Sequence, residues 1–372
     1  MPACKRDGVR FEEKKQSPMN NILLYCRAGF EPECSQEFSE LSKPFGAGEI
    51  VSAAAGSGCV VYRFSSSLHA PECARLLPFS SLCFSRQMVA ASDPVGPLSS
   101  GNRVSPLVDE AGRLGSRFTD FFIETADTNE AKQLSPLCRK LGRPFEEALK
   151  KAGLLDGATG GDGRRFHVFF TATDRAYAGF SYVNNSSPWP MGIPRLKFPS
   201  GAPSRSTLKL EEAFIVFMSA GERERLLKNG MSAVDLGASP GGWTWQFTSR
   251  GMRVTAVDNG RISSELLGSG LVRHVPADGF TFAPRTPVDW MVCDIVEQPS
   301  RISKLAAQWI GRQWCRCAIF NLKLPMKKRY DEVKRCKDIV ACELKKVGVR
   351  YKLSLKQLYH DREEVTAYLR GV

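Results

Sequence analysis

A run of small residues in the second half of the chain has the composition of a ligand-binding turn. The apolar segment 233–236 is followed by Gly-Ala-Ser-Pro-Gly-Gly over residues 237–242 and then by Trp243. Glycine lets the backbone approach a ligand where a Cβ atom would stand in the way, and a helix that starts at the turn points free N–H groups into the same space. The stretch predicts a strand, a tight turn and a helix around a nucleotide-like ligand. The alternative is a turn that binds nothing.

The spacing of these glycines narrows the choice of ligand. The dinucleotide fingerprint G-x-G-x-x-G is absent, and Trp243 stands where a P-loop has lysine. The run Asp-Leu-Gly-Ala-Ser-Pro-Gly-Gly-Trp over residues 235–243 resembles motif I of S-adenosylmethionine (SAM) methyltransferases, notably those that methylate RNA ribose. The resemblance implies that SAM is the bound molecule.

Three aspartates follow the turn at intervals that suit SAM. Asp258 ends an apolar run 21 residues after Gly237, about where nucleotide-binding α/β folds place the acid for the ribose hydroxyls. Asp278 suits the adenine amino group, and Asp294 can accept from the ammonium of the ligand. A single aspartate at a strand end is usually a helix cap or a turn former. Three in series after a glycine turn favour a binding site.

The segment around Asp294 decides the methyl acceptor. Cys-Asp-Ile-Val-Glu over residues 293–297 lacks the prolines of the [ND]-P-P-[YF] motif, which is typical of methylation at exocyclic base nitrogens. Neither Cys293 nor Cys317 has the context of a nucleophile for pyrimidine C5. Asp294 and Lys323 remain, and a lysine acts as a base when desolvation and a neighbouring cation, here Lys209, lower its pKa. Such a base suits a ribose 2′-OH, which is a poor nucleophile.

The elements that must position these residues alternate between strands and helices from residue 231 onward. Repeated βα units indicate an open, mostly parallel sheet with helices on both faces, in which ligands lie at the carboxyl ends of the strands. The last two strands have no helical segment between them and are expected to form an antiparallel hairpin at the edge. The expected strands are 233–236, 253–257, 271–275, 290–293, 318–322, 350–355 and 365–369, with helices over 243–250, 262–267, 300–312 and 330–347. The pattern matches the seven-stranded Rossmann-like methyltransferase topology.

The N-terminal half has a different, α+β pattern. Strands are expected over 21–26, 58–64 and 82–89, with helices over 31–41 and 71–77. After a Pro, Gly and Ser-rich linker at 93–101, we expect a strand over 118–124, a helix from residue 131, a second helix over 145–155, a glycine loop over 157–163 and a hairpin of 167–170 with 176–183. Helices between strands after residue 118 fit a ferredoxin-like sandwich and resemble the THUMP domain of RNA-modifying enzymes.

Charge favours a polyanionic partner. The chain of 372 residues has a formal net charge of +13. Residues 301–372 contain 18 Lys and Arg against 7 Asp and Glu, a distribution that suits nucleic acid. The segment 176–210 has no acid and interleaves four basic residues with Tyr182, Trp189 and Phe198, as in segments that track a phosphate backbone. The alternative for the charge distribution is a basic surface that serves only solubility. The alternative for the segment 176–210 is a linker packed over two domains.

Cysteine usage and hydropathy place the protein in the cytoplasm. The 12 cysteines are scattered without C-x-x-C spacing, and there are only 4 histidines, so we expect reduced thiols and no metal. No apolar segment reaches membrane-spanning length, and the charged first 18 residues do not form a secretory signal.

Lys209, Asp294, Lys323 and Glu364 resemble the K-D-K-E tetrad of ribose 2′-O-methyltransferases related to FtsJ/RrmJ. Glu364 is assigned to the tetrad because it directly precedes the expected apolar strand 365–369, and Glu363 is the alternative. Further segments resemble the RlmM family of bacterial 23S rRNA cytidine 2′-O-methyltransferases, which have an N-terminal THUMP domain: 78–82, 126–130, 191–199, 204–209 and 358–365. The likeness covers about residues 19–370.

The RlmM resemblance implies SAM as donor, a cytidine in 23S rRNA or in a large-subunit precursor as acceptor, and Lys323 as proton acceptor. It implies SAM contacts at Ser206, Ser239, Pro240, Gly241, Gly242, Asp258, Asp278 and Asp294. We expect a monomer that binds no membrane. The expected organisation is an extension at 1–18, an α+β subdomain at 19–92, a THUMP-like domain at 102–183, a basic aromatic linker at 184–210 and the methyltransferase domain at 211–372. The alternatives are an RNA base methyltransferase and an RNA-binding ribosome-assembly factor.

Overall fold

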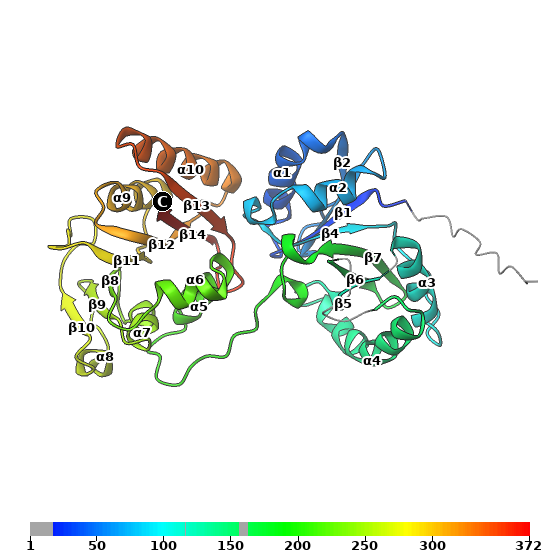
Figure 1. Cartoon of the computed structure of the whole chain (residues 1–372), viewed down its shortest axis with the longest axis horizontal. Coiled ribbons are helices and arrows are strands. Elements are labelled where there is room, and N and C mark those ends of the chain that lie inside the picture. Colours follow the sequence, from blue (N-terminus) through cyan, green and yellow to red (C-terminus); the bar gives the residue numbers. More distant parts are fainter. Residues whose placement is uncertain (1–17, 116, 156–162) are drawn as a thin grey trace, which may run out of the picture.

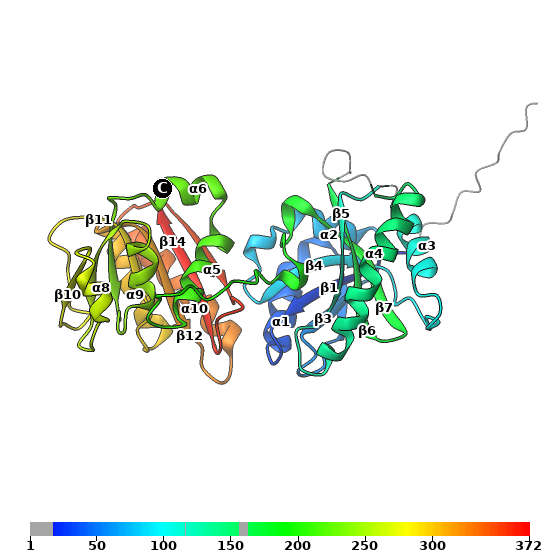
Figure 2. The same ribbon diagram turned by 90° about the horizontal axis from the view of Figure 1, so that it is seen from below.

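The chain folds into two lobes, each built on a seven-stranded sheet. A computed structural model describes residues 18–115, 117–155 and 163–372; the expected N-terminal extension and most of the expected glycine loop lie outside these residues. Figure 1 shows the two lobes joined by an extended segment, and the view in Figure 2 shows the same separation.

The N-terminal sheet is mostly antiparallel, in the order β2-β3-β1-β4-β7-β6-β5. Its first part runs strand, helix, two strands, helix, strand, which is the ferredoxin-like arrangement. The elements of this lobe are β1 (Asn21–Cys26), α1 (Glu31–Leu41), η1 (Lys43–Phe45), β2 (Gly48–Ser52), β3 (Cys59–Phe64), α2 (His69–Leu76), η2 (Phe79–Ser81), β4 (Ser85–Ala91), α3 (Val104–Leu114), β5 (Asp120–Thr125), η3 (Ala131–Leu134), α4 (Ser135–Lys151), β6 (Arg164–Ala172) and β7 (Arg175–Tyr182).

Two expectations for this lobe need correction, and two elements were not expected. The ferredoxin-like order occupies β1 to β4 rather than the region after residue 118, whose strands β5, β6 and β7 extend the same sheet. The helix expected from residue 131 begins as the short 3-10 helix η3, and the helix expected over 145–155 is the second half of α4, which runs through Pro144 because Cys138, Phe145 and Leu149 are buried along one side of it. The edge strand β2 and the helix α3 were not predicted.

The C-terminal sheet has the order β10-β9-β8-β11-β12-β14-β13. The pairs from β10 to β12 are parallel, and β14 is antiparallel to both β12 and β13, so the expected topology and edge hairpin are confirmed. The elements are α5 (Thr207–Phe217), α6 (Ala220–Leu226), β8 (Ser232–Leu236), α7 (Gly242–Thr248), β9 (Arg253–Val257), α8 (Ser264–Gly268), β10 (Val272–Val275), β11 (Val288–Cys293), α9 (Pro299–Gly311), β12 (Cys315–Lys323), α10 (Arg329–Lys346), β13 (Tyr351–Lys356) and β14 (Glu364–Gly371).

Helices cover both faces of this sheet. Figure 1 shows α9 and α10 on one side and α5 and α7 on the other. Trp309 and Leu344 belong to the apolar core on the first side, while Phe214, Phe247 and Trp290 form the core on the second. Because both faces are covered, the polar residues that follow the strands are held at the sheet edge.

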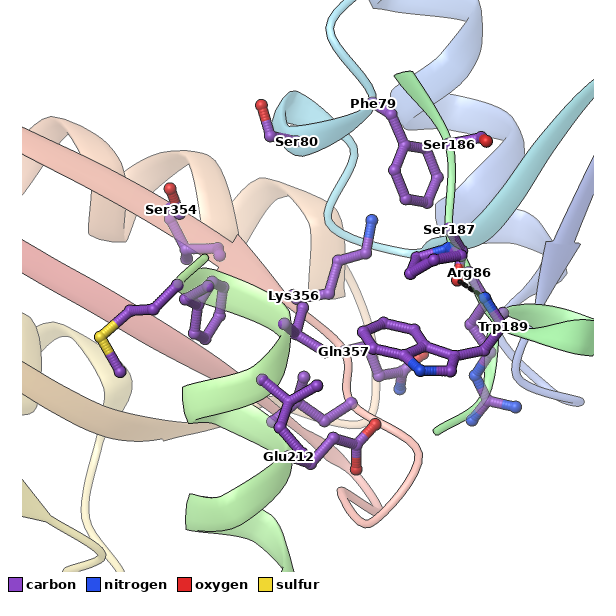
Figure 3. Close-up of a pocket in the computed structure, with 18 of the residues that line it drawn as sticks. Phe79, Ser80, Arg86, Ser186, Ser187, Trp189, Glu212, Ser354, Lys356 and Gln357 are labelled. Atoms are coloured by element: carbon purple, nitrogen blue, oxygen red, sulfur yellow. Dashed lines mark hydrogen bonds between the residues drawn. The ribbon is translucent and has the colours of Figure 1, made fainter. Parts of the chain in front are cut away.

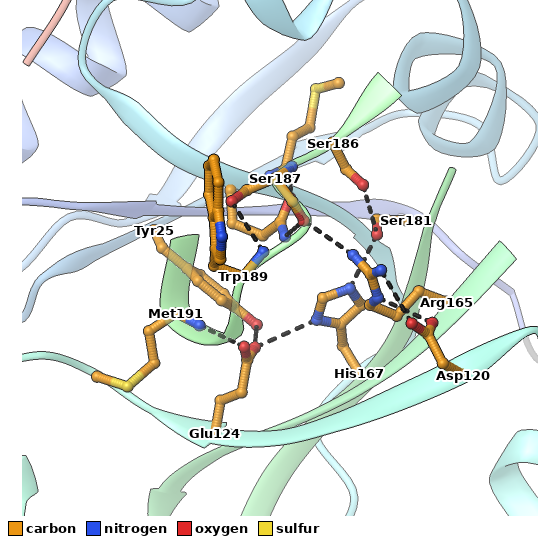
Figure 4. Close-up of polar contacts among 12 residues, drawn as sticks. Tyr25, Asp120, Glu124, Arg165, His167, Ser181, Ser186, Ser187, Trp189 and Met191 are labelled. Carbon is orange, nitrogen blue, oxygen red and sulfur yellow. Dashed lines mark hydrogen bonds and ion pairs between the residues drawn. The ribbon is translucent and has the colours of Figure 1, made fainter. Parts of the chain in front are cut away.

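The segment between the lobes, which contains η4 (Val183–Asn185) and η5 (Pro190–Gly192), is anchored on the N-terminal sheet. Arg165 donates to the carbonyl of Ser187 at 2.8 Å, and Glu124 accepts from the backbone N–H of Met191. Figure 4 shows this buried network, in which Glu124 also joins Tyr25 and His167. The basic segment therefore leaves the N-terminal lobe from a fixed position.

The two lobes contact each other where α10 and the end of β13 meet α1 and residues 82–84. Phe84 lies edge-on to Tyr330, and Lys334 pairs with Glu40 at 2.9 Å. The backbone N–H of Gln357 donates to the carbonyl of Cys83 at 2.8 Å, and the buried ammonium of Lys356 donates to the carbonyl of Leu82 at 2.7 Å. These contacts bring the β13–β14 loop against the N-terminal lobe.

Candidate functional site

The parallel register brings the polar strand ends together. Leu236 pairs with Val257 on one side and with Cys293 on the other, and Cys293 also pairs with Phe320. The residues that follow β8, β9 and β11 are therefore neighbours at one sheet edge, as expected for carboxyl ends of parallel strands. They are Gly237, Asp258 and Asp294.

The antiparallel strand β14 adds the fourth member of the tetrad. Glu364 begins β14 directly opposite Lys323 at the end of β12. Lys209, from the first turn of α5, forms ion pairs with Oε1 of Glu364 and, at 3.7 Å, with Asp294. Lys323 Nζ lies 3.7 Å from Oε2 of the same glutamate. The four residues form one charged cluster, drawn from α5, β12, β14 and the residue after β11.

The neighbouring acid has a different environment. Glu363 is 65% exposed and pairs with Arg329 at 2.7 Å, whereas Glu364 is only 6% exposed and lies between the two lysines. Geometry therefore joins Glu364, and not Glu363, to the cluster.

Burial differs across the tetrad. The side chain of Lys323 is 39% exposed, against 14% for Lys209. Burial by itself lowers the pKa of Lys209, but the carboxylates of Asp294 and Glu364 outweigh it, so the pKa is raised and the ammonium stays charged. Burial raises the pKa of Asp294, an effect that Lys209 and a hydrogen bond from Asn321 oppose. The cluster combines a fixed internal cation, Lys209, with an accessible amine, Lys323.

A buried hydrogen-bonded chain, which was not expected from the sequence, supports Asp294. Asn321 donates to Asp294 Oδ1 at 2.8 Å and accepts from the hydroxyl of Thr366 at 2.8 Å. The same hydroxyl lies 3.1 Å from both carboxyl oxygens of Asp361. The backbone N–H of Leu358 donates to Asp361 Oδ2 at 2.9 Å. Alternating side chains of β12 and β14 could have indicated Asn321 and Thr366, since polar residues on buried strands need partners.

The proton count along this chain determines the state of Asp361. A hydroxyl has one hydrogen, and that of Thr366 is used by Asn321. We infer that the contact between Thr366 and Asp361 carries the proton of a protonated carboxyl group, which donates to the Thr366 oxygen. Burial, together with the charge of Glu364, raises the pKa of Asp361 well above its usual range, in agreement with this assignment. The neutral acid orients the amide of Asn321 toward Asp294.

The glycine turn has the backbone that its sequence predicts. Gly237 and Gly241 have φ values of +79° and +116°, which favour glycine. A Cβ atom at Gly242 would lie 2.2 Å from the Ser206 hydroxyl oxygen, and the indole N–H of Trp243 donates to the carbonyl of Ser206 at 3.1 Å. The start of α5 is therefore packed directly against the start of α7, while Ser239 and Pro240 remain exposed at the tip of the turn.

The two remaining acids also form turns. Asp258 is half-buried and accepts from the N–H groups of Ser239 at 3.0 Å and Gly260 at 2.6 Å. Asp278 is exposed and accepts from the N–H of Phe280 at 2.9 Å. Neither carboxylate has a cationic partner among the residues that the structure describes. Asp258 thus links the turn after β8 to the end of β9.

Beneath the turn lies a buried acid that the sequence analysis did not single out. Asp235, in β8, is fully buried and accepts from the Thr244 hydroxyl at 2.7 Å. Burial raises the pKa of Asp235 to about 7. Its second oxygen has no partner within the described part of the chain.

Other classes of site are absent from the described residues. Within them, no group of three or more His, Cys, Asp and Glu side chains could hold a metal ion, and the eleven cysteines are free thiols. None of the helices in this part of the chain has the length and apolar character needed to span a membrane.

Comparisons with known proteins agree with the two-lobe organisation. Residues 19–89 match the RlmM ferredoxin-like domain, residues 102–182 the N-terminal region of ribosomal RNA large subunit methyltransferase M, and residues 202–344 the FtsJ-like methyltransferase family. The first match coincides with the ferredoxin-like strands β1 to β4.

Whole-length relatives extend these matches. The chain is similar to proteins named ribosomal RNA large subunit methyltransferase M from Methylococcus capsulatus (51% identical, covering 94% of this chain and 98% of the relative), Cellvibrio japonicus (49%, 95% and 99%) and Mannheimia succiniciproducens (47%, 94% and 99%). Identity at this level over nearly the whole of both chains shows that the protein belongs to the ribosomal RNA large subunit methyltransferase M family.

Proposed function

We propose that this methyltransferase transfers the methyl group of SAM to the ribose 2′-oxygen of a cytidine in 23S rRNA, with Lys323 as the general base. The observation that carries the proposal is the cluster of Lys209, Asp294, Lys323 and Glu364 beside the glycine turn. The names of the relatives support ribosomal RNA as the substrate, and the tetrad supports a hydroxyl acceptor.

The residues at the sheet edge fit SAM by the chemistry of their oxygen atoms. A ribose diol, an adenine amino group and an ammonium group all donate hydrogen bonds, and ionised carboxylates only accept them. Asp258, Asp278 and Asp294 follow successive strands, and the first two have no cationic partner among the described residues. Together with Ser206 and residues 239–242, these aspartates would hold SAM, which supplies an electrophilic methyl group when bound.

Three members of the tetrad have distinct parts in the proposed reaction. Lys323, the most accessible member, would take the proton of the ribose hydroxyl on Nζ, and bound SAM would supply the methyl group that the 2′-oxygen accepts. Lys209 remains charged between Asp294 and Glu364 and would hold these two carboxylates in place beside Lys323. Glu364 contacts both lysines and fixes their separation.

The proposal is tested with labelled SAM and 23S rRNA, as free transcript and as precursor particles, followed by alkaline digestion. A 2′-O-methyl group blocks cleavage at its 3′ phosphate and yields an alkali-resistant labelled dinucleotide. A labelled mononucleotide would instead show base methylation, and no incorporation into either RNA would favour an assembly factor.

The assigned base is tested with Lys323→Ala, and Lys327→Ala is the matched control because that lysine is exposed on the adjoining loop. We expect Lys323→Ala to bind SAM as the wild type does and to lose methyl transfer by about 10²- to 10⁴-fold. Lys327→Ala should keep the chemical step. Wild-type turnover by Lys323→Ala would refute its role as base.

A further inference from the structure

Arg86, in β4, has unused hydrogen-bonding capacity at the junction of the lobes. Its side chain is 5% exposed, and the nitrogens Nε and Nη2 have no partner within the described residues. Its single ion pair, from Nη1 to Asp127, is long at 3.6 Å. Buried charges are normally paired and hydrogen-bonded, so Arg86 needs an acceptor that the described residues do not supply.

Arg86 lies in the wall between two cavities. One, of about 390 Å³, lies between the lobes and is bordered by Trp189, Glu212 and Lys356; Figure 3 shows these side chains and Arg86 around it. The other, of about 350 Å³, is lined by Arg27, Ala28, Arg86, Asp127 and residues 359–362. The second cavity is lined by three arginines, whereas the first is lined by one arginine and two lysines.

The charges around the smaller cavity favour an anion. Arg27, Arg86 and Arg362 line it. The guanidinium group of Arg195 lies over the ring of Tyr359, which also lines the cavity. Asp127 is shared between Arg86 and Arg195. The other acids nearby are Asp361, whose pKa burial raises well above its usual range, and Glu212, which is already engaged by His360 and by the backbone of residues 359 and 360.

The aromatic ring at this cavity is already covered by cations. The guanidinium groups of Arg86 and Arg195 lie 5.5 Å and 5.1 Å from the centre of the Tyr359 ring, which is within cation–π range. A nucleobase that stacked there would have to displace one of them. The arrangement therefore favours a compact anionic group over a nucleobase. Arginine is the side chain best suited to bidentate hydrogen bonding with a phosphate.

The cavity adjoins the tetrad. The β13–β14 loop that contributes residues 359–362 continues into Glu364, so Arg362 and Glu364 are separated along the chain by roughly 7 Å at most. Asp361 interacts electrostatically with both Glu364 and Lys209. The loop residues that line this cavity are therefore close along the chain to the tetrad member Glu364.

We propose that the cavity lined by Arg27, Arg86 and Arg362 binds a backbone phosphate of the rRNA strand next to the methylated nucleotide. This inference rests on the proposed function and adds to it the element that sets the register of the strand. The phosphate would supply the acceptor that Arg86 lacks, and it would contact both lobes at once. The position of the rRNA strand would then depend on the N-terminal lobe, although that lobe would not contact the target base.

The test compares the binding of 23S rRNA transcript by Arg362→Gln and Arg27→Gln with that of the wild type between 50 and 200 mM KCl. The control, Arg273→Gln, removes the same charge from the exposed edge strand β10, at the opposite end of the sheet from β13. Each test variant should weaken binding about three- to tenfold and reduce the slope of log K against log salt by about 0.7 to 0.9. The control should keep the wild-type slope, and SAM affinity should be unchanged in all variants.

Arg86→Gln and Arg86→Lys are compared in the same assay after thermal unfolding has shown which of them is folded. Wild-type affinity and slope in both Arg362→Gln and Arg27→Gln would overturn the inference, whatever the Arg86 variants do. It would also be overturned if inorganic phosphate stabilised the wild type but not Arg362→Gln while RNA binding was equal, because the cavity would then be a site for free anions. Binding is measured without turnover, so an absence of methyl transfer would count against the proposed function alone.

Discussion

Replacing Asp361 by asparagine tests whether a buried acid is held neutral beside the tetrad. In the neutral-acid assignment its carboxyl group donates to the Thr366 oxygen, 3.1 Å away, and accepts from the N–H of Leu358. Asparagine has nearly the same shape, with an NH₂ group to donate and a carbonyl oxygen to accept. The substitution should therefore preserve the hydrogen-bonded chain through Asn321 to Asp294.

The raised pKa of Asp361 determines how the free energy of unfolding should change with pH. Above the ordinary pKa of aspartate the unfolded chain releases this proton, while the folded protein, in which burial raises the pKa of Asp361, retains it. The unfolded state then binds fewer protons, so the free energy of unfolding of the wild type falls as pH rises. The loss is about 1–2 kcal/mol for each pH unit between the two pKa values. Asp361→Asn has no such proton, so its stability relative to wild type should rise with pH by this amount.

The assay is urea unfolding of both proteins from pH 4.5 to pH 8, followed by tryptophan fluorescence. Five of the six tryptophans lie in the C-terminal lobe, at positions 243, 245, 290, 309 and 314. Thr366→Val is the matched control, because it keeps the titrating acid and leaves two buried polar groups without partners, a loss of about 2–6 kcal/mol. A difference in unfolding free energy between Asp361→Asn and wild type that stays constant over this pH range would refute the neutral-acid assignment.

Three further substitutions test the cation, the SAM contact and the turn. Lys209→Gln removes the cation between two poorly exposed carboxylates and should lower the free energy of unfolding by about 3–5 kcal/mol; unchanged urea unfolding would contradict the internal role of this lysine. Asp258→Ala should weaken SAM binding at least about tenfold in calorimetric titration, whereas Glu265→Ala, on the exposed side of α8, should not. Gly241→Ala puts a Cβ atom 2.3 Å from Leu266 Cδ1 at a φ of +116° and should destabilise the protein by about 1–3 kcal/mol. Gly268→Ala, with open space around it, should leave the melting temperature the same or higher, and equal melting temperatures for the two glycine variants would disprove the strain at Gly241.

The sequence predicted the features that depend on neighbouring residues. The seven strands of the C-terminal sheet and its edge hairpin follow from apolar runs, and the left-handed backbone at Gly237 and Gly241 follows from residues without a Cβ atom. The helix α3 also carries a local signal, since Leu107, Ala111 and Leu114 lie on one buried face, although we did not predict it. By contrast, β2 is an edge strand in which Ile50 is the one residue that is not exposed, so no periodic pattern indicated it.

Only the tertiary structure decided which distant residues share an environment. Pairing of β12 with β14 places Glu364 opposite Lys323 and joins Asn321 to Thr366, and no local pattern encodes that register. The neutral state of Asp361 and the unpaired nitrogens of Arg86 arise from burial between elements far apart in sequence. Residue types and spacing specify which chemistry is available, because strands, turns and helices form from local preferences. Distances, burial and protonation depend on the packing of whole layers, and so they became apparent only once the two lobes were assembled.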